Sequence, residues 1–309
     1  MIYEQACPHP SEGLRHDLSV GSLVVSLLIP VDERESGPAV MPTSKHCGTP
    51  GEANELIGGV PIVHYLDFAS RGRGQVVRLL FEDAGIAYED VRYSDEELPE
   101  AKRTILQEMN PASTMPILEL QGKAWTQSYA LLRHFSRVLG KYDGRTEEEK
   151  YWVDAMCDLA ADCKRRPLTL LHPRPPTCAD RSPGRNVFVF ALFNPDKQVY
   201  AKHKADDRVR YMYALETQLK KNEFFGQGPF VLGKTFTYAD MVIYQVCHDE
   251  QLIRDGRREL RPFPRLTRLV DALESRPNVR AFRNSDRYKG DGIPVDMVDG
   301  VQDGPTSSV

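Results

Sequence analysis

The sequence lacks the features of secreted, zinc-binding and membrane-spanning chains. Its six cysteines are scattered, without a CxxC pair or a Cys/His spacing of the zinc type. Such thiols are typical of a reducing compartment, so we expect a cytoplasmic protein without a metal. The longest apolar run, Leu18 to Ile29, is about twelve residues long and too short to span a bilayer. Acidic residues precede it and no small-residue cleavage site follows, which argues against a signal peptide.

A strong excess of charge of one sign is missing as well. The formal net charge of -4 argues against a dedicated nucleic-acid binder. Residues 1–60 hold three basic and eight acidic side chains, residues 291–309 hold four Asp and no base, and residues 61–290 therefore carry a net charge of +5. This mildly positive middle suits a small anionic substrate. We expect a small-molecule partner, with no nucleic acid and no membrane.

What is present is enough apolar sequence for two domains. With 309 residues, 41% of them hydrophobic, the chain can bury a substantial core. Residues 1–60 show no sustained periodicity, so we expect a disordered leader. Residues 61–140 alternate between the two periodicities, with strands expected at 62–67, 88–93, 116–120 and 123–125 and helices at 75–84, 97–108 and 128–139. This β-α-β-α-β-β-α order predicts a thioredoxin-like domain.

Residues 146–285 predict an all-helical domain, so the expected fold class is α/β followed by all-α. Thr146 and Glu149 form a capping box that opens a long helix reaching Cys163. Further helices fit residues 199–221, 237–254 and 265–275. Residues 167–195 hold six prolines and cannot form a regular helix, and residues 286–309 are expected to be a flexible tail.

Three motifs follow one another in the first domain. The first strand ends in His64-Tyr65-Leu66-Asp67, and Arg71-Gly72-Arg73-Gly74 opens the next helix. Residues 110–118 (NPASTMPIL) precede the third strand, and residues 125–128 (WTQS) lead into the third helix. In this order the motifs resemble those of the cytosolic glutathione S-transferases, most nearly the sigma-like group that uses a tyrosine. The resemblance covers about residues 60–285.

The resemblance implies that Tyr65 donates a hydrogen bond to the sulfur of glutathione, with Arg73 behind it. A free thiol has a pKa of about 8.5 and is mostly protonated at neutral pH. Lowering that pKa by about two units requires about 2.7 kcal/mol of preferential stabilisation of the thiolate. The loop between Tyr65 and Arg71 is two residues longer than the sigma pattern, which leaves Ser70 as a competitor because other branches of the family use a serine here.

The resemblance also implies a set of residues that hold the rest of glutathione. Pro116 is expected to be cis, so that the backbone of Met115 pairs with the peptide backbone of glutathione. Gln127 and Ser128 would hold its γ-glutamyl end. Lys102 would contact the glycyl carboxylate, although the family's usual Trp is replaced by Leu98. In the homodimer that the resemblance implies, Asp162 would reach the glutathione amine of the partner subunit.

The function expected from this resemblance is a glutathione transferase that directs the thiolate at a small hydrophobic electrophile, in detoxification or secondary metabolism. Glutathione would be a substrate. In the alternative, a glutathione-dependent isomerase, it would be a cofactor. A third alternative is a non-catalytic scaffold with the same fold. Residues 164–185 hold six basic side chains and one acid. With the apolar run at 187–193 they would form either a lid over the electrophile or a disordered surface insertion.

Overall fold

The computed structural model describes residues 42–112, 114–162, 197–221 and 223–288. These residues belong to one compact unit, residues 40–309. Within the described residues, no helix is both long enough and apolar enough to cross a membrane. The expected Pro/Arg-rich insertion at 167–195 lies outside the described residues.

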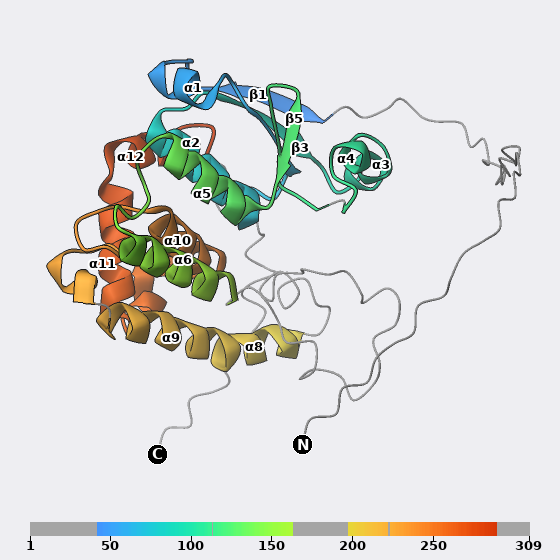
Figure 1. The fold of residues 1–309 in the computed structure, drawn as a ribbon. Helices are drawn as coiled ribbons and strands as arrows, with labels where there is room; N and C mark the ends of the chain where they lie inside the picture. The colour runs from blue at the N-terminus through green and yellow to red at the C-terminus, as the bar shows by residue number, and fades with distance from the viewer. Residues whose placement is uncertain (1–41, 113, 163–196, 222, 289–309) are drawn as a thin grey trace, which may run out of the picture. The chain divides into compact units, whose positions relative to one another are not determined.

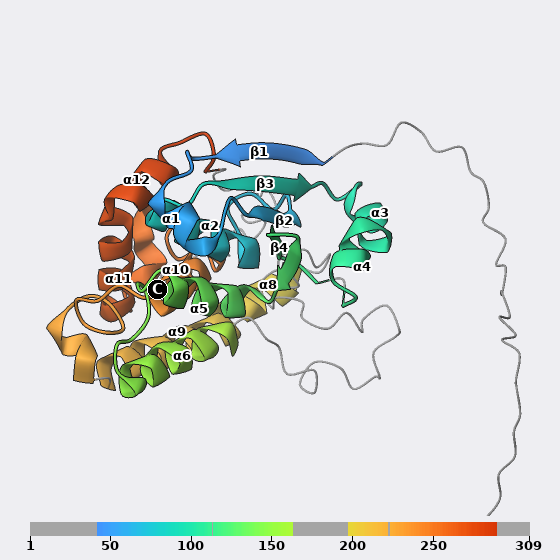
Figure 2. The ribbon, with the colours of Figure 1, turned by 45° about the horizontal axis from the view of Figure 1, so that its top comes forward.

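The first half of this unit is built on a mixed sheet of five strands (Figures 1 and 2). The strand order is β1-β3-β2-β4-β5. The central strands β2 and β3 run parallel, and β4, β5 and β1 are each antiparallel to their neighbour. The strands are β1 (Thr43–Cys47), β2 (Ile62–Leu66), β3 (Tyr88–Tyr93), β4 (Ile117–Leu120) and β5 (Lys123–Thr126).

Two helices cover one face of the sheet, α2 (Gly72–Ala84) and α5 (Ser128–Val138). They lie side by side in Figure 1. Each has apolar residues three or four positions apart on its inner face, and these are buried against the sheet. Helices α3 (Leu98–Arg103) and α4 (Ile105–Met109) follow β3 and pack on a second, smaller apolar cluster. The thioredoxin-like layout is therefore confirmed.

The second half of the unit is helical. Every residue of α10 is buried, because α10 packs between α6 and α2. A capping box between Thr237 and Asp240 opens α10, and Tyr238 N donates to the carbonyl of Tyr142 in the interdomain linker at 2.8 Å. The elements are α6 (Glu147–Asp162), α8 (Lys197–Ala205), α9 (Asp207–Lys221), α10 (Tyr238–Asp249), α11 (Pro264–Ser275), α12 (Pro277–Arg283) and the 3₁₀ helices η3 (Glu223–Gln227) and η4 (Asp255–Leu260).

The prediction of a disordered leader at residues 1–60 is wrong for the last part of that range. Residues 43–47 form β1 and residues 52–57 form α1 (Glu52–Ile57). The first four residues of β1 are exposed, so the strand has no buried alternation to reveal it. It is held by pairing with β3. Asn54 in α1 holds the start of β3, accepting from Ala87 N at 2.9 Å and donating to Ala87 O at 2.8 Å.

The predicted start of the flexible tail, residue 286, is too early, because the first three residues of this range make defined contacts. Arg287 forms a two-pronged ion pair with Glu82 at 2.9 and 2.8 Å. The hydroxyl of Tyr288 lies 2.7 Å from Nε2 of His248. Residues 289–309 lie outside the described residues.

Two of the expected helices are divided. The helix expected at 97–108 is split at Thr104, whose φ and ψ of -115° and -109° are not helical. The helix expected at 199–221 is split between Ala205 and Asp207.

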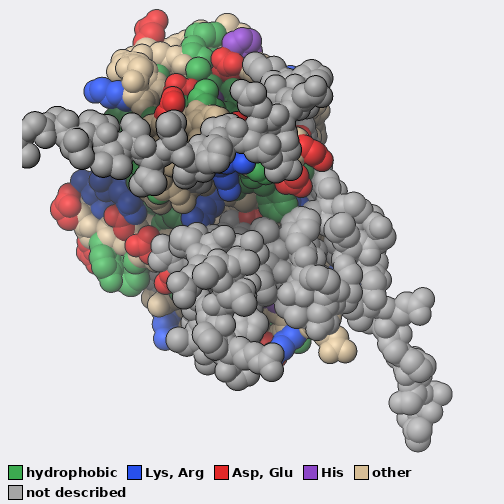
Figure 3. Space-filling model, turned by 90° about the vertical axis from the view of Figure 1, so that its right-hand side faces the viewer, with side chains coloured by type: hydrophobic (Ala, Val, Ile, Leu, Met, Phe, Trp, Pro, Cys, Tyr) green, Lys and Arg blue, Asp and Glu red, His purple; other side chains and the backbone are tan. Residues whose placement is uncertain are grey.

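The surface seen from the side of α3 and α4 carries a group of basic side chains. Figure 3 shows Lys and Arg side chains near the middle of the described surface.

Candidate functional site

The strand register brings three of the predicted segments to one end of the sheet. His64 in β2 pairs with Ile117 in β4, so Met115 and Pro116 lie beside the end of β2. Ile117 pairs in turn with Thr126 in β5, which places Gln127 at the same end. This is the carboxyl end of the parallel pair β2 and β3, from which α2 departs. Ligands of open α/β sheets bind at such ends.

Tyr65 lies across the first turn of α2. Its hydroxyl oxygen accepts a hydrogen bond from the backbone N–H of Arg73 at 3.0 Å, and its side chain is buried. A Cβ at position 74 would stand 2.4 Å from Cγ of Tyr65, so the ring needs glycine there. Gly72 has a φ of 73°, which favours glycine for backbone reasons as well. The Arg-Gly-Arg-Gly motif therefore fits the tyrosine ring against the positive end of a helix dipole.

A buried chain of charges supports the loop after β2. Arg92 on β3 donates to the carboxylate of Asp67 at 3.2 Å and to the carbonyl of Ala69 at 3.0 Å. Its Nε donates to Asp90 at 2.8 Å, and Asp90 also accepts two bonds from Arg78 of α2 at 2.9 and 2.7 Å. The charged side chains of residues 78, 90 and 92 are all buried. A buried charge is unfavourable unless it is paired, so each of these side chains needs its partner in the network.

The helical half reaches the same loop through the last turn of α10. Asp249 accepts a hydrogen bond from the backbone N–H of Gly72 at 3.1 Å, and its backbone carbonyl accepts from Arg71 at 3.4 Å. Gln245 orients the Asp249 carboxylate at 2.7 Å and donates to the carbonyl of Ser70 at 3.3 Å. The start of α2 is thus fixed from both halves of the described chain.

The other face of the sheet carries a hydrogen-bonded chain next to this end. His64 contacts the Tyr93 hydroxyl through Nδ1 at 2.8 Å and the Glu119 carboxylate through Nε2 at 2.6 Å. Burial, with help from the negative charges of Glu119 and Glu97, raises the pKa of Tyr93 to about 12. Tyr93 is therefore a neutral phenol that links β2, β3 and β4.

The segments before and after β4 and β5 have the backbone features that the sequence predicted. The Met115-Pro116 peptide bond is cis, as expected. Gln127 has a φ of 70°, a conformation that non-glycine residues adopt rarely. Its side chain is exposed, while Ser128 begins α5 and is buried.

Two predicted residues lie apart from this group. Lys102 is exposed on α3 and has no side-chain hydrogen bond or ion pair to a described residue. Asp162 is the last residue of α6 and is also exposed. The competitor Ser70 is fully buried, and its Oγ has no hydrogen-bond partner among the described residues. No group of three or more His, Cys, Asp or Glu in the described chain is arranged to hold a metal ion.

The side chains that support the candidate site were not predicted from the sequence. In the sequence alone, nothing distinguishes Asp67, Arg92 and Asp249 from other charged residues. The contact between Gly72 and Asp249 could not be predicted because the two residues are 177 positions apart. The one available signal was the charged pattern of β3, where Asp90 and Arg92 interrupt a buried strand.

The fold and the site define a two-domain class in which a thioredoxin-like half carries the ligand end of the sheet and an all-helical half braces it. The sequence profile described as "Glutathione S-transferase, N-terminal domain" matches residues 62–137, and "Glutathione S-transferase, C-terminal domain" matches residues 185–286. The hematopoietic prostaglandin D synthase of Gallus gallus is 31% identical over 216 residues, which is 70% of this chain and 92% of that protein.

Two further relatives agree. Glutathione S-transferase P 10 of Caenorhabditis elegans is 25% identical over 244 residues, covering 78% of this chain and 97% of the relative. The solved glutathione S-transferase of Ascaris lumbricoides is 26% identical with a TM-score of 0.54, covering 74% of this chain and 100% of that one. The chain belongs to the glutathione S-transferase family. Its relatives support a glutathione transferase or a related isomerase.

Proposed function

We propose that this protein is a tyrosine-type glutathione transferase that directs the bound thiolate at a small hydrophobic electrophile. The observation that carries the proposal is the hydrogen bond from Arg73 N–H to the Tyr65 hydroxyl at 3.0 Å. A phenol that accepts from a helix N-terminus becomes a stronger donor, because hydrogen bonds in a chain polarise one another. Tyr65 can then stabilise a thiolate with its own O–H.

The remaining predicted residues take supporting roles in this proposal. The backbone of Met115 at the cis bond pairs with the peptide backbone of glutathione. Gln127 and Ser128 hold the γ-glutamyl end at the start of α5, where backbone N–H groups favour an anion. Lys102 meets the glycyl carboxylate. We further propose a cytoplasmic homodimer, in which Asp162 reaches the glutathione of the partner subunit.

Burial argues for Tyr65 rather than Ser70 as the activating hydroxyl. Ser70 is 1% exposed, and its backbone carbonyl accepts a hydrogen bond from Gln245 of α10. Tyr65 is itself 7% exposed, but its hydroxyl lies at the first turn of α2, where an anion is favoured.

A glutathione-dependent isomerase is the second candidate, and the 31% identity to a prostaglandin D synthase favours it. The same tyrosine and the same binding residues serve both reactions. In the transferase the sulfur–carbon bond persists in the product, whereas in the isomerase the thiolate adds, is later expelled and leaves glutathione unconsumed. Measuring glutathione consumption per product formed separates the two.

The experiment that tests the proposal compares two variants. The protein should adsorb to immobilised glutathione and conjugate a generic aryl halide. Tyr65→Phe should lower kcat at least about tenfold, because removal of one donor to a developing anion has effects of that size or larger. Its adsorption to glutathione should be largely unchanged, since the removed group acts on the sulfur.

Ser70→Ala is the matched control, because it also removes one hydroxyl from the same loop. Its kcat should stay within about threefold of wild type. If Ser70→Ala loses activity and Tyr65→Phe does not, Ser70 is the activating residue. If the wild-type protein neither adsorbs to glutathione nor conjugates the halide, the protein is a scaffold with the transferase fold.

A further inference from the structure

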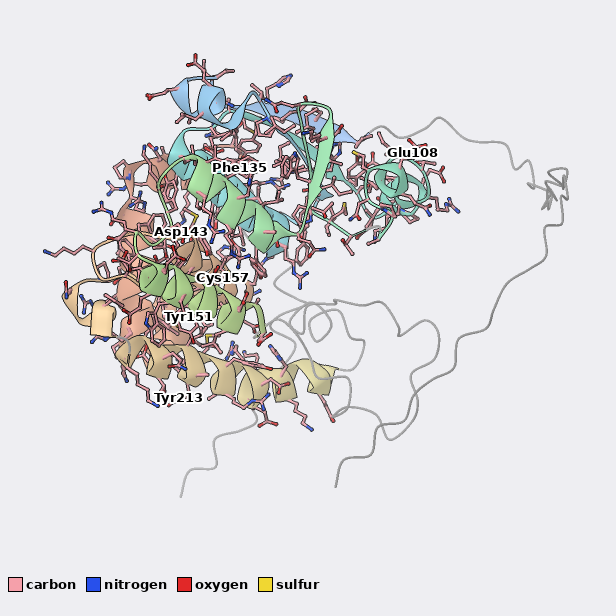
Figure 4. All side chains as sticks on the ribbon, in the orientation of Figure 1. Glu108, Phe135, Asp143, Tyr151, Cys157 and Tyr213 are labelled. Carbon is pink, nitrogen blue, oxygen red and sulfur yellow. The ribbon has the colours of Figure 1, made fainter. Side chains whose placement is uncertain are left out.

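A pocket lies on the linker between the two halves, away from the sheet end described above. It has a volume of about 970 Å³ and is lined by residues from α2, the end of α5, the linker, the start of α6, the loop before α10 and the start of α12. Figure 4 labels Asp143, one of the lining residues, where the chain passes from α5 to α6. This pocket is large enough for a small organic molecule.

One part of the lining is an ion pair that joins the two halves, between the buried Asp83 and the partly exposed Arg276. Arg276 donates two hydrogen bonds to Asp83 of α2 at 2.8 and 2.7 Å. The guanidinium carbon of Arg276 also lies 4.0 Å from the centre of the Phe236 ring. Burial, with help from the negative charge of Asp83 and a hydrogen bond to it, raises the pKa of Tyr142, so Tyr142 stays a neutral phenol. The negative charge of Asp83 is therefore already compensated by Arg276.

Ser136 adds an unused polar atom to the lining. It is 0% exposed, and its Oγ has no hydrogen-bond partner among the described residues. A buried hydroxyl without a partner is unfavourable by about 1–3 kcal/mol. Because no part of Ser136 is exposed to solvent, the groups of the pocket that can meet an anion are its cations.

The rim of the pocket carries an excess of positive charge. Asp143 accepts from Nε of Arg137 at 3.0 Å, so the second acid of the lining is also compensated. Lys141 and Arg145 are exposed, and neither side chain has an acidic partner within salt-bridge distance in the described part of the chain. Lys150 adds a third cation, which pairs with the exposed carboxylate of Glu147 at 2.6 Å. The lining therefore has a net positive charge with both of its acids neutralised.

We propose that this linker pocket is a binding site for a small polyanion with two or more phosphate or carboxylate groups. Cations on the rim attract the anionic groups, and the partly exposed Arg276 guanidinium is a further positive group of the lining that an anion can meet. Because the lining comes from both halves, an occupied pocket joins them. The site does not depend on glutathione chemistry.

The test uses pyrophosphate and citrate as probes on the full-length protein. We expect saturable binding by isothermal titration calorimetry, weakened by added salt, and an increase in Tm at saturating probe. Lys141→Glu/Arg145→Glu should lower the affinity at least about tenfold, because both reversals replace attraction by repulsion at the rim. Neither residue belongs to the proposed catalytic site, so glutathione conjugation without probe should be unchanged.

Lys221→Glu/Arg268→Glu is the matched control, since it makes the same change in net charge at two exposed helix positions outside the pocket. Its affinity should stay within about threefold of wild type. The absence of saturable binding of both probes to the wild-type protein would overturn the proposal. An equal loss of affinity in the control would also overturn it, because binding would then reflect net charge alone.

Discussion

In the α/β half, buried charges gather at one end of the sheet, where Arg78, Asp90 and Arg92 are linked beneath the loop after β2. In the helical half, α10 is buried along its whole length, and two of its acids lie at opposite ends. Asp240 closes the capping box at the first turn, whereas Asp249, at the last turn, accepts a hydrogen bond from Gly72 at the start of α2. The two halves therefore contribute differently: the sheet end carries the residues proposed to react, and the last turn of α10 supports the start of α2 beside them.

Gly74 tests the close fit at the sheet end and should give the largest effect. Gly74→Ala places a Cβ 2.4 Å from Cγ of Tyr65, so the ring must move away from α2. We expect kcat/KM for conjugation to fall about a hundredfold, since misplacement of a catalytic group by about 1 Å has effects of that size. Gly226→Ala is the control, because its Cβ would meet nothing within 4 Å. Equal activity of Gly74→Ala and wild type would contradict the placement of the ring.

Arg92 tests the buried charges beneath the loop. Arg92→Met removes one of the two arginine partners of Asp90 and the partner of the partly exposed Asp67, while Arg78 still pairs with Asp90. We expect a loss of about 1–3 kcal/mol in the free energy of unfolding. Urea denaturation measures this loss. Arg92→Lys keeps the positive charge but loses the planar guanidinium that donates to several acceptors at once. It should therefore recover part of the stability but less of kcat. Full recovery of both by lysine would show that the geometry of the guanidinium is unimportant.

Asp249 tests the support that comes from the helical half. Asp249→Asn keeps the shape of the side chain but removes the charge that faces Gly72 N–H and Gln245. We expect a loss of about 1–3 kcal/mol in stability and a fall in kcat of about tenfold. Steady-state kinetics with Asp158→Asn as control, an exposed acid on α6, separates position from charge. A loss confined to stability, with kcat unchanged, would remove α10 from the account of the site.

Asp240 tests the other end of α10 and should give the smallest effect. Burial raises the pKa of this carboxyl to about 7, against the hydrogen bonds from Val231 N–H and Thr237. Its contribution to stability is therefore fully present below its ordinary pKa of 3.8 and is lost as pH rises through 7. The difference in Tm between wild type and Asp240→Asn should be larger at pH 5 than at pH 8. Parallel pH profiles would contradict the raised pKa, and activity should follow stability alone.

The sequence was most informative where the pattern is local. The buried faces of α2 and α5 repeat at helical spacing, and the capping boxes at Thr146 and Thr237 involve residues three apart, so these elements could be predicted. Strand β1 could not, because its side chains are exposed and its stability comes from pairing with residues more than 40 positions later. The contact of Asp249 with Gly72 spans 177 residues and depends on how the two halves pack.

The candidate site shows the same limit. Tyr65, Met115, Pro116 and Gln127 were found from their motifs, and the strand register places them at one end of the sheet. The Arg92 network was not predicted, since a buried ion pair in a strand has the same sequence signature as a strand with polar residues on its exposed face.

The most direct test of the central claim is the pKa of the glutathione thiol when it is bound to the protein. It can be followed by the ultraviolet absorbance of the thiolate as a function of pH, in wild type and in Tyr65→Phe. We expect a pKa about two units below the free value of about 8.5 in wild type, and a return toward the free value in the variant. A bound thiol that titrates like free glutathione, or a lowered pKa that persists in Tyr65→Phe, would contradict the role proposed for Tyr65.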